Sequence, residues 1–167
     1  GLANLVAEML QRGAAGMTSE EIAARFESMG SRFSVTASTS YVSFDLQCLA
    51  ENFMPSLELM LSILERPEFP ESELTKLKKQ VEDWIKADED DLYKYTVQGA
   101  LEALYPDTPI AYSSYGKIDD VKRFRTQDLK EFHKKHYVGS NMVVAIVGDF
   151  YTRELKEALL QSLGRFS

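Results

Sequence analysis

Two residues of the first predicted helix have types and spacing that bear on metal chemistry: Asn4 and Glu8. Side chains four positions apart point the same way on an α-helix, so Asn4 and Glu8 share one face. An amide oxygen and a carboxylate suit a hard cation weakly and zinc poorly. The two residues are therefore either ordinary polar surface groups or the remnant of a metal site.

The two histidines form a second candidate site, because His133 and His136 lie three positions apart in the stretch HKKH. This spacing places both rings on one helix face, but a metal would need a third ligand from elsewhere. The alternative is a surface helix that Phe132 and Tyr137 dock onto the body of the protein. We expect this structural role.

Three further features have simple structural interpretations. The acidic run at residues 88–91 predicts a solvated junction between two helices, with favourable charge at the second N-terminus. Tyr112 and Tyr115 lie in a proline-bounded loop, where they either contact a partner or peptide or pack within the loop; we expect packing. Cys48 is the single cysteine, which excludes an intrachain disulfide, and no histidine is near it in sequence to activate a thiol.

Composition excludes several function classes. The 167 residues carry a net charge of −7, which argues against a groove that binds nucleic acid through phosphate neutralisation and against attraction to anionic lipid. No apolar run approaches the ~20 residues that span a bilayer, so we expect no membrane insertion. The chain begins almost directly in a helix without a starting Met, and we expect it to be a segment of a longer polypeptide.

The hydrophobic period separates helices from strands. Thr18 and Glu21 form the sequence signature of a capping box at the second helix. The helix near residues 90–104 is expected to bury Leu92, Tyr95, Ala100 and Leu104. The predicted helices cover residues 2–12, 18–29, 52–66, 71–87, 90–104, 117–123, 126–137 and 152–163.

Alternation of apolar and hydroxyl residues predicts an antiparallel hairpin from strands at residues 33–38 and 41–49. The run NMVVAIV, residues 141–147, is the most apolar short stretch and predicts a buried central strand. These elements favour an α+β fold with an antiparallel sheet backed by helices. We expect one domain over residues 1–167, whose sheet is completed by polypeptide outside this segment.

Several stretches resemble the M16 family of metallopeptidases. The likeness runs from GLANLVAEMLQRG through the hairpin to PEFPESELTKLKKQ, LYPDTPIAYSSYGKIDDV and DLKEFHKKHYVGSNMVVAIVGDF. Active members carry HxxEH on the first helix and a further Glu about 75 residues later. Two imidazoles and that carboxylate hold zinc, and the inner Glu deprotonates the bound water. The resemblance places Asn4, Ala7, Glu8 and Trp84 at these four positions.

The resemblance therefore implies a non-catalytic half of an M16 peptidase, with no zinc in this domain and no hydrolysis by it alone. Zinc is expected only in an active partner half, either a homologous M16 zinc peptidase subunit or the other half of the same chain. Together the halves would enclose a chamber for peptides. Exposed edges of the hairpin could pair with an extended peptide substrate, and Ser34, Thr36 and Ser38 are the expected binding residues.

Two other functions remain open from sequence. One is a structural or assembly subunit, similar to the core subunits of respiratory complexes, which would form a stable complex without proteolysis. The other is a self-sufficient enzyme with relocated metal ligands, which would hold about one zinc per chain. Whether an HxxEH domain is encoded in the same chain or beside it separates the first hypothesis from the second.

Overall fold

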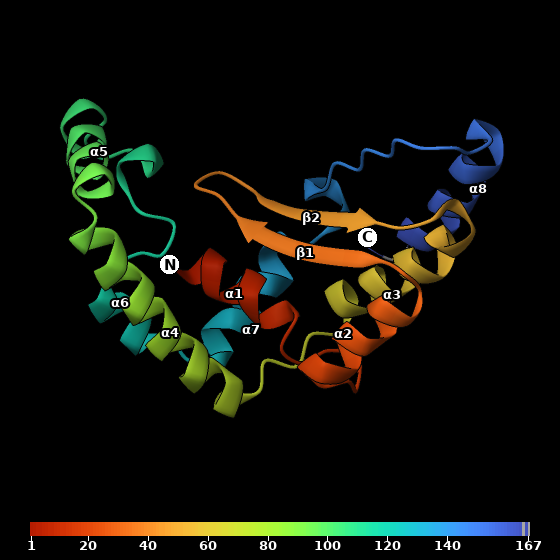
Figure 1. Cartoon of the computed structure of the whole chain (residues 1–167), viewed down its shortest axis with the longest axis horizontal. Coiled ribbons are helices and arrows are strands. Elements are labelled where there is room, and N and C mark those ends of the chain that lie inside the picture. The colour runs from red at the N-terminus through yellow and green to blue at the C-terminus, as the bar shows by residue number, and fades with distance from the viewer. Residues whose placement is uncertain (165, 167) are drawn as a thin grey trace.

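Helix α1 (Leu2–Leu10) lies centrally in the computed structural model, which describes residues 1–164 and 166 (Figure 1). Apolar residues at helical spacing give it one fully buried stripe: Leu5, Val6, Met9 and Leu10. The helix packs against helices α4 (Glu71–Asp90) and α7 (Thr126–His136) and against strand β1 (Arg32–Ala37). Burial of this stripe sets the direction in which the polar residues of α1 point.

The second helix and the hairpin form as the sequence predicts. Helix α2 (Ser19–Ser28) begins with the capping box, because Thr18 Oγ1 accepts from the Glu21 amide while the Glu21 carboxylate accepts from the Thr18 amide. Strands β1 (Arg32–Ala37) and β2 (Val42–Gln47) then pair antiparallel, from Arg32 opposite Gln47 to Ala37 opposite Val42. The fold class is confirmed as α+β, with an antiparallel sheet backed by helices.

The remaining core comes from helices on either side of α1. These are α3 (Phe53–Glu65), α4 (Glu71–Asp90), α6 (Ile118–Arg123) and α7 (Thr126–His136). Their inward faces bury one apolar cluster that includes Leu57, Leu77, Val81 and Leu129. Three short 3-10 turns link the elements: η1 (Ala50–Asn52), η2 (Pro109–Ala111) and η3 (Gly139–Asn141).

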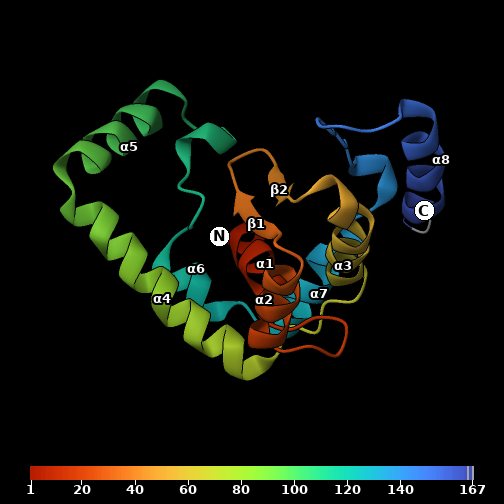
Figure 2. The same ribbon diagram turned by 45° about the vertical axis from the view of Figure 1, so that its right-hand side comes forward.

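Helix α5 (Leu92–Leu104) stands at one end of the molecule, beyond the end of α4 (Figure 2). The prediction that it buries Leu92, Tyr95, Ala100 and Leu104 is wrong. No residue of α5 is buried, and the side chains of Leu92 and Leu104 are 83% and 70% exposed. The elements that pack most closely on α5 are α4 and η2, which are too few to cover it.

The prediction of a central strand at residues 141–147 is also wrong. Asn141 ends η3, and the chain then runs without regular structure to helix α8 (Thr152–Leu163). Val143 and Val147 are 97% and 98% exposed. A strand requires hydrogen-bonding neighbours, and in the described residues β1 and β2 pair only with each other.

Helix α8 lines an open apolar groove rather than a closed core. The groove lies between α8 and the irregular segment before it, and Val144, Ile146 and Leu159 are among its lining residues. Ser162 Oγ donates to Glu58 Oε1 at 2.6 Å and so connects α8 to α3. None of the described helices is long and apolar enough to cross a membrane.

The contrast between α4 and α5 predicts different costs for the same substitution. Leu77 is fully buried on α4, so Leu77→Ala should lower the free energy of unfolding by about 2–5 kcal/mol through the cavity that it leaves. Leu92→Ala, on exposed α5, is the matched control and should change it by less than about 0.5 kcal/mol. Urea unfolding followed by circular dichroism measures both, and equal losses would contradict the exposed position of α5.

Candidate functional site

The residues at the HxxEH positions lie on the side of α1 that adjoins its buried stripe. Asn4 is only 6% exposed, and no described residue forms a hydrogen bond with its buried Oδ1 atom. Ala7 is 1% exposed, so it is covered by protein and offers no group that could move a proton. These two positions serve packing in this chain and not acid–base chemistry.

Glu8 is held in a polar contact between two helices. Its carboxylate lies 3.8 Å from the Arg12 guanidinium, which donates to Gln80 Oε1 on α4 at 3.0 Å. Burial raises the pKa of Glu8 above its usual value, and the nearby Arg12 charge lowers it by a smaller amount. Glu8 and Arg12 therefore link α1 to α4.

Trp84 occupies the fourth position, on α4. Its half-buried ring lies 5.6 Å from the Tyr115 ring, centroid to centroid, at an interplanar angle of 41°. The loop of Tyr115 presses closely on the start of α1, because a Cβ on Gly116 would lie 2.8 Å from the Gly1 nitrogen. An indole N–H is a donor without a lone pair for a metal.

These four residues do not fit a zinc ion. Zinc sites use imidazole, thiolate and carboxylate ligands, and Glu8 alone offers such a group here. Its carboxylate is engaged with Arg12, and the ring of Trp84 packs on Tyr115. In the described residues no group of three His, Cys, Asp or Glu side chains is arranged to hold a metal elsewhere.

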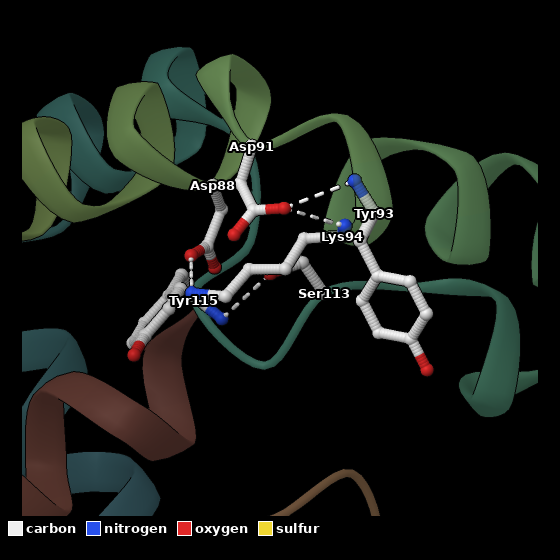
Figure 3. A network of polar contacts seen from close by, with 6 residues as sticks. All are labelled: Asp88, Asp91, Tyr93, Lys94, Ser113 and Tyr115. Carbon is white, nitrogen blue, oxygen red and sulfur yellow. Dashed lines mark hydrogen bonds and ion pairs between the residues drawn. The ribbon is translucent and has the colours of Figure 1, made fainter.

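The acidic run joins α4 to α5, as the sequence predicts (Figure 3). Asp91 caps α5, because its Oδ1 accepts from the amides of Tyr93 and Lys94 at 3.0 and 3.1 Å. The Lys94 ammonium forms an ion pair with Asp88 Oδ1 at 2.5 Å.

The two tyrosines of the proline-bounded loop differ in their surroundings. Tyr115 packs on Trp84, whereas Tyr112 is 53% exposed.

The two histidines do not converge on one ligand. His133 Nε2 lies 2.8 Å from the Leu64 carbonyl oxygen, and its ring stacks on Tyr137 at 4.6 Å. The His136 ring instead lies 4.4 Å from Phe132. Burial lowers the pKa of His133, while its hydrogen bond to the Leu64 carbonyl raises it by less. The expected structural role of this helix agrees with these contacts.

The hairpin residues Ser34, Thr36 and Ser38 share one side of the ladder. The Ser38 amide donates to the Tyr41 carbonyl at 2.8 Å and closes the turn. Hydrogen-bonded pairs alternate with non-bonded pairs along an antiparallel ladder, so the backbones of Thr36 and Ser34 also face β2. Only their side chains, which are exposed on Ser34 and Thr36, remain for contacts with another molecule.

The outward backbone groups of β1 belong to the residues between them: Phe33, Val35 and Ala37. No third strand pairs with β1 in the described part of the chain, so this edge lacks a strand neighbour. The alternation of the sequence predicts the strand, but which amides face outward follows only from the turn that closes the hairpin.

Comparison with models of protein families shows which family the chain belongs to. The family model described as Insulinase (Peptidase family M16) matches residues 1–116. The chain belongs to the M16 peptidase family. The model described as Peptidase M16 inactive domain matches residues 123–167. The resemblance seen in the sequence is thereby confirmed.

Curated relatives of this M16 chain bear both peptidase and non-peptidase names. An uncharacterized zinc protease of Rickettsia bellii is 23% identical over 95% of this chain and 39% of that protein. The non-peptidase homolog YmxG of Helicobacter pylori is 26% identical over 89% of this chain and 34% of that protein. Bovine cytochrome b-c1 complex subunit 1 is 21% identical over 77% of this chain and 27% of that protein. The chain thus spans less than two fifths of each relative.

Solved structures share the fold over nearly the whole M16 chain. The peptidase M16 inactive domain from Pseudomonas fluorescens has a TM-score of 0.90 and 27% identity, and the match covers 98% of this chain and 40% of that one. The periplasmic protease PqqL of Escherichia coli has a TM-score of 0.85 and 20% identity, and the match covers 99% of this chain and 19% of that one. The fold is therefore that of an M16 peptidase-like domain within longer chains.

Sequence reasoning missed two residues that contact the HxxEH positions directly or through a neighbour, Arg12 and Gln80, and it did not identify Trp84 as the partner of Tyr115. The i, i+4 spacing of Glu8 and Arg12 is a readable signal for their ion pair. No sequence signal connects Gln80 to Arg12 or Tyr115 to Trp84, because those contacts join segments that are distant along the chain.

The environment of His133 predicts acid sensitivity. Its folded pKa lies below the ordinary value of 6.5, so the unfolded chain binds the proton more readily. The contribution of His133 to stability is therefore complete above pH 6.5 and is lost as the pH falls from there through the folded pKa. We expect His133→Gln to reduce this pH-dependent loss, as measured by urea unfolding between pH 7.5 and 5.

The matched control for this measurement is His136→Gln, which leaves the contact between His133 and Leu64 in place and should keep the loss. If the two variants lost stability with pH to the same extent, His133 would not be the responsible group.

Proposed function

We propose that this M16 chain is the non-catalytic half of a peptidase whose other half carries HxxEH and zinc. The observation that carries the proposal is the replacement of the catalytic apparatus by packing. Ala7 is buried where a general base is required, and Trp84 packs on Tyr115 where a ligand is required. The companion half supplies the chemistry, and this half supplies part of the wall of a peptide-binding chamber.

A second candidate function has its own support among the relatives. Bovine cytochrome b-c1 complex subunit 1 and the non-peptidase homolog YmxG both match this chain. Either name is compatible with a structural or assembly subunit that binds partners without proteolysis. The two functions differ in one measurable property, which is whether the complex with the companion half cleaves peptides.

Reconstitution from separate halves tests the proposal. The chain is mixed with the HxxEH-bearing M16 half from the same polypeptide or the same genome, and cleavage of a fluorogenic peptide library is followed. We expect no cleavage by this chain alone and at least tenfold more by the mixture than by the companion alone. Replacing the base Glu of the companion's HxxEH by Gln should abolish this cleavage.

Two results would change the assignment. A stable complex without cleavage would favour the structural subunit. Cleavage by this chain alone, abolished by a chelator and restored by zinc, would contradict a non-catalytic half and support relocated metal ligands.

We further propose that the β1 edge contributes to peptide capture by strand addition. The outward backbone groups of Phe33, Val35 and Ala37 would pair with the peptide, and the side chains of Ser34 and Thr36 would flank it. Ser38 is less suited to direct contact because its amide is used in the turn. The prediction that Ser34, Thr36 and Ser38 bind the peptide thus remains a hypothesis. Its test requires a substitution at a residue whose backbone amide points away from β2.

Ala37→Pro removes one outward amide donor while sparing the hydrogen bonds between β1 and β2, and proline is tolerated at such edge positions. We expect the affinity of the reconstituted complex for a fluorescein-labelled substrate peptide to fall at least fivefold in anisotropy titrations. Thr39→Pro, in the turn, is the matched control and should bind as the unmodified chain does. Unchanged affinity in Ala37→Pro, with the fold intact by circular dichroism, would reject capture at this edge.

A further inference from the structure

Helix α5 presents an unpartnered apolar seam to solvent. Tyr93, Val97, Ala100 and Leu104 follow one another at intervals of four, three and four residues. All four are exposed, with Tyr93 78%, Val97 39% and Leu104 70% accessible. Alternating steps of four and three residues are the spacing by which one helix packs against another, knobs into holes. The seam therefore has the pattern of a helix–helix contact without the second helix.

The seam is held in place by contacts at the start and in the middle of α5. At its start, Asp91 caps the helix and the Lys94 ammonium pairs with Asp88 (Figure 3). Further along, Gln98 Nε2 donates to the Ala111 carbonyl oxygen at 2.7 Å and fastens α5 to the loop that follows. These contacts orient α5 without covering the seam.

The surroundings of the seam are strongly acidic. Residues 88–107 contain six carboxylates and a single cation, Lys94, which is already paired with Asp88. A partner helix that buried the seam would meet negative charge at both ends of α5. Lysine or arginine beside its own apolar stripe would complement that charge, whereas acidic flanks would be repelled.

The longer relatives contain additional polypeptide that could supply such a helix. The Pseudomonas fluorescens structure matches 98% of this chain, which includes α5, yet that match covers only 40% of its own length. The fold that contains α5 therefore occurs in a chain of which more than half lies outside the match. This favours a protein domain as the occupant over solvent or a short peptide.

We propose that the seam of Tyr93, Val97, Ala100 and Leu104 docks an amphipathic α-helix of the companion M16 half, with basic residues flanking the apolar stripe of that helix. The inference rests on the proposed function, since it assigns a contact between the two halves. Beyond the proposed function, it specifies which surface of this chain makes the contact and which residue types the partner surface carries.

The test compares association of the two halves by sedimentation velocity. The double variant Val97→Glu and Leu104→Glu places charge in the seam at exposed positions, so its fold should persist, which circular dichroism checks. We expect it to weaken association with the companion half at least tenfold. Leu49→Glu is the matched control, because Leu49 is 60% exposed but lies after β2, outside α5. It should associate as the unmodified chain does.

The outcomes separate this inference from the proposed function. If the halves associate and the seam variant associates equally well, the inference is overturned while the pairing of halves stands. If the seam variant loses affinity for the labelled peptide but not for the companion half, the surface belongs to the substrate and the inference is again overturned. If the halves do not associate at all, the proposed function and the inference fail together.

Discussion

The rotation of α1 about its own axis is the constraint on which the other features depend. Leu5, Val6, Met9 and Leu10 are fully buried, and each such side chain contributes roughly 1.5–3 kcal/mol when removed from water. A rotation by one residue, about 100°, would carry part of this stripe into solvent and polar side chains into the core. Burial of this stripe therefore fixes the directions in which the side chains of Asn4, Ala7 and Glu8 point.

The residues at the four positions of the M16 zinc motif take part in contacts that join neighbouring elements. Glu8 contacts Arg12, which reaches Gln80 on α4, and Trp84 packs on Tyr115. The Arg12–Gln80 hydrogen bond joins the end of α1 to α4, and the ring contact joins α4 to the loop before α6. The elements that would hold a metal in an active homologue are thus held together here by ordinary hydrogen bonds and ring packing.

Exposed apolar surface is concentrated in two places remote from α1. One is α5, with its seam and acidic surroundings, and the other is the segment before α8, where Val143 and Val147 face solvent. Large exposed apolar patches on a protein commonly mark surfaces that meet another polypeptide. Both patches fit a chain that spans less than two fifths of its curated relatives.

The sequence by itself determined most of the local structure and the residue types at the four positions of the M16 zinc motif. Hydrophobic period, the capping box of Thr18 and Glu21 and the two-residue turn of the hairpin are local signals, and they predicted the helices and the β1–β2 hairpin, although not the irregular run at residues 141–147. Residue type alone shows that Ala7 cannot act as a base. Only the tertiary structure decided which apolar segments are covered: among residues 1–164 and 166, none forms a strand partner for residues 142–147 and none covers the exposed face of α5. A pattern records that side chains are apolar, whereas burial depends on neighbours that are distant in sequence.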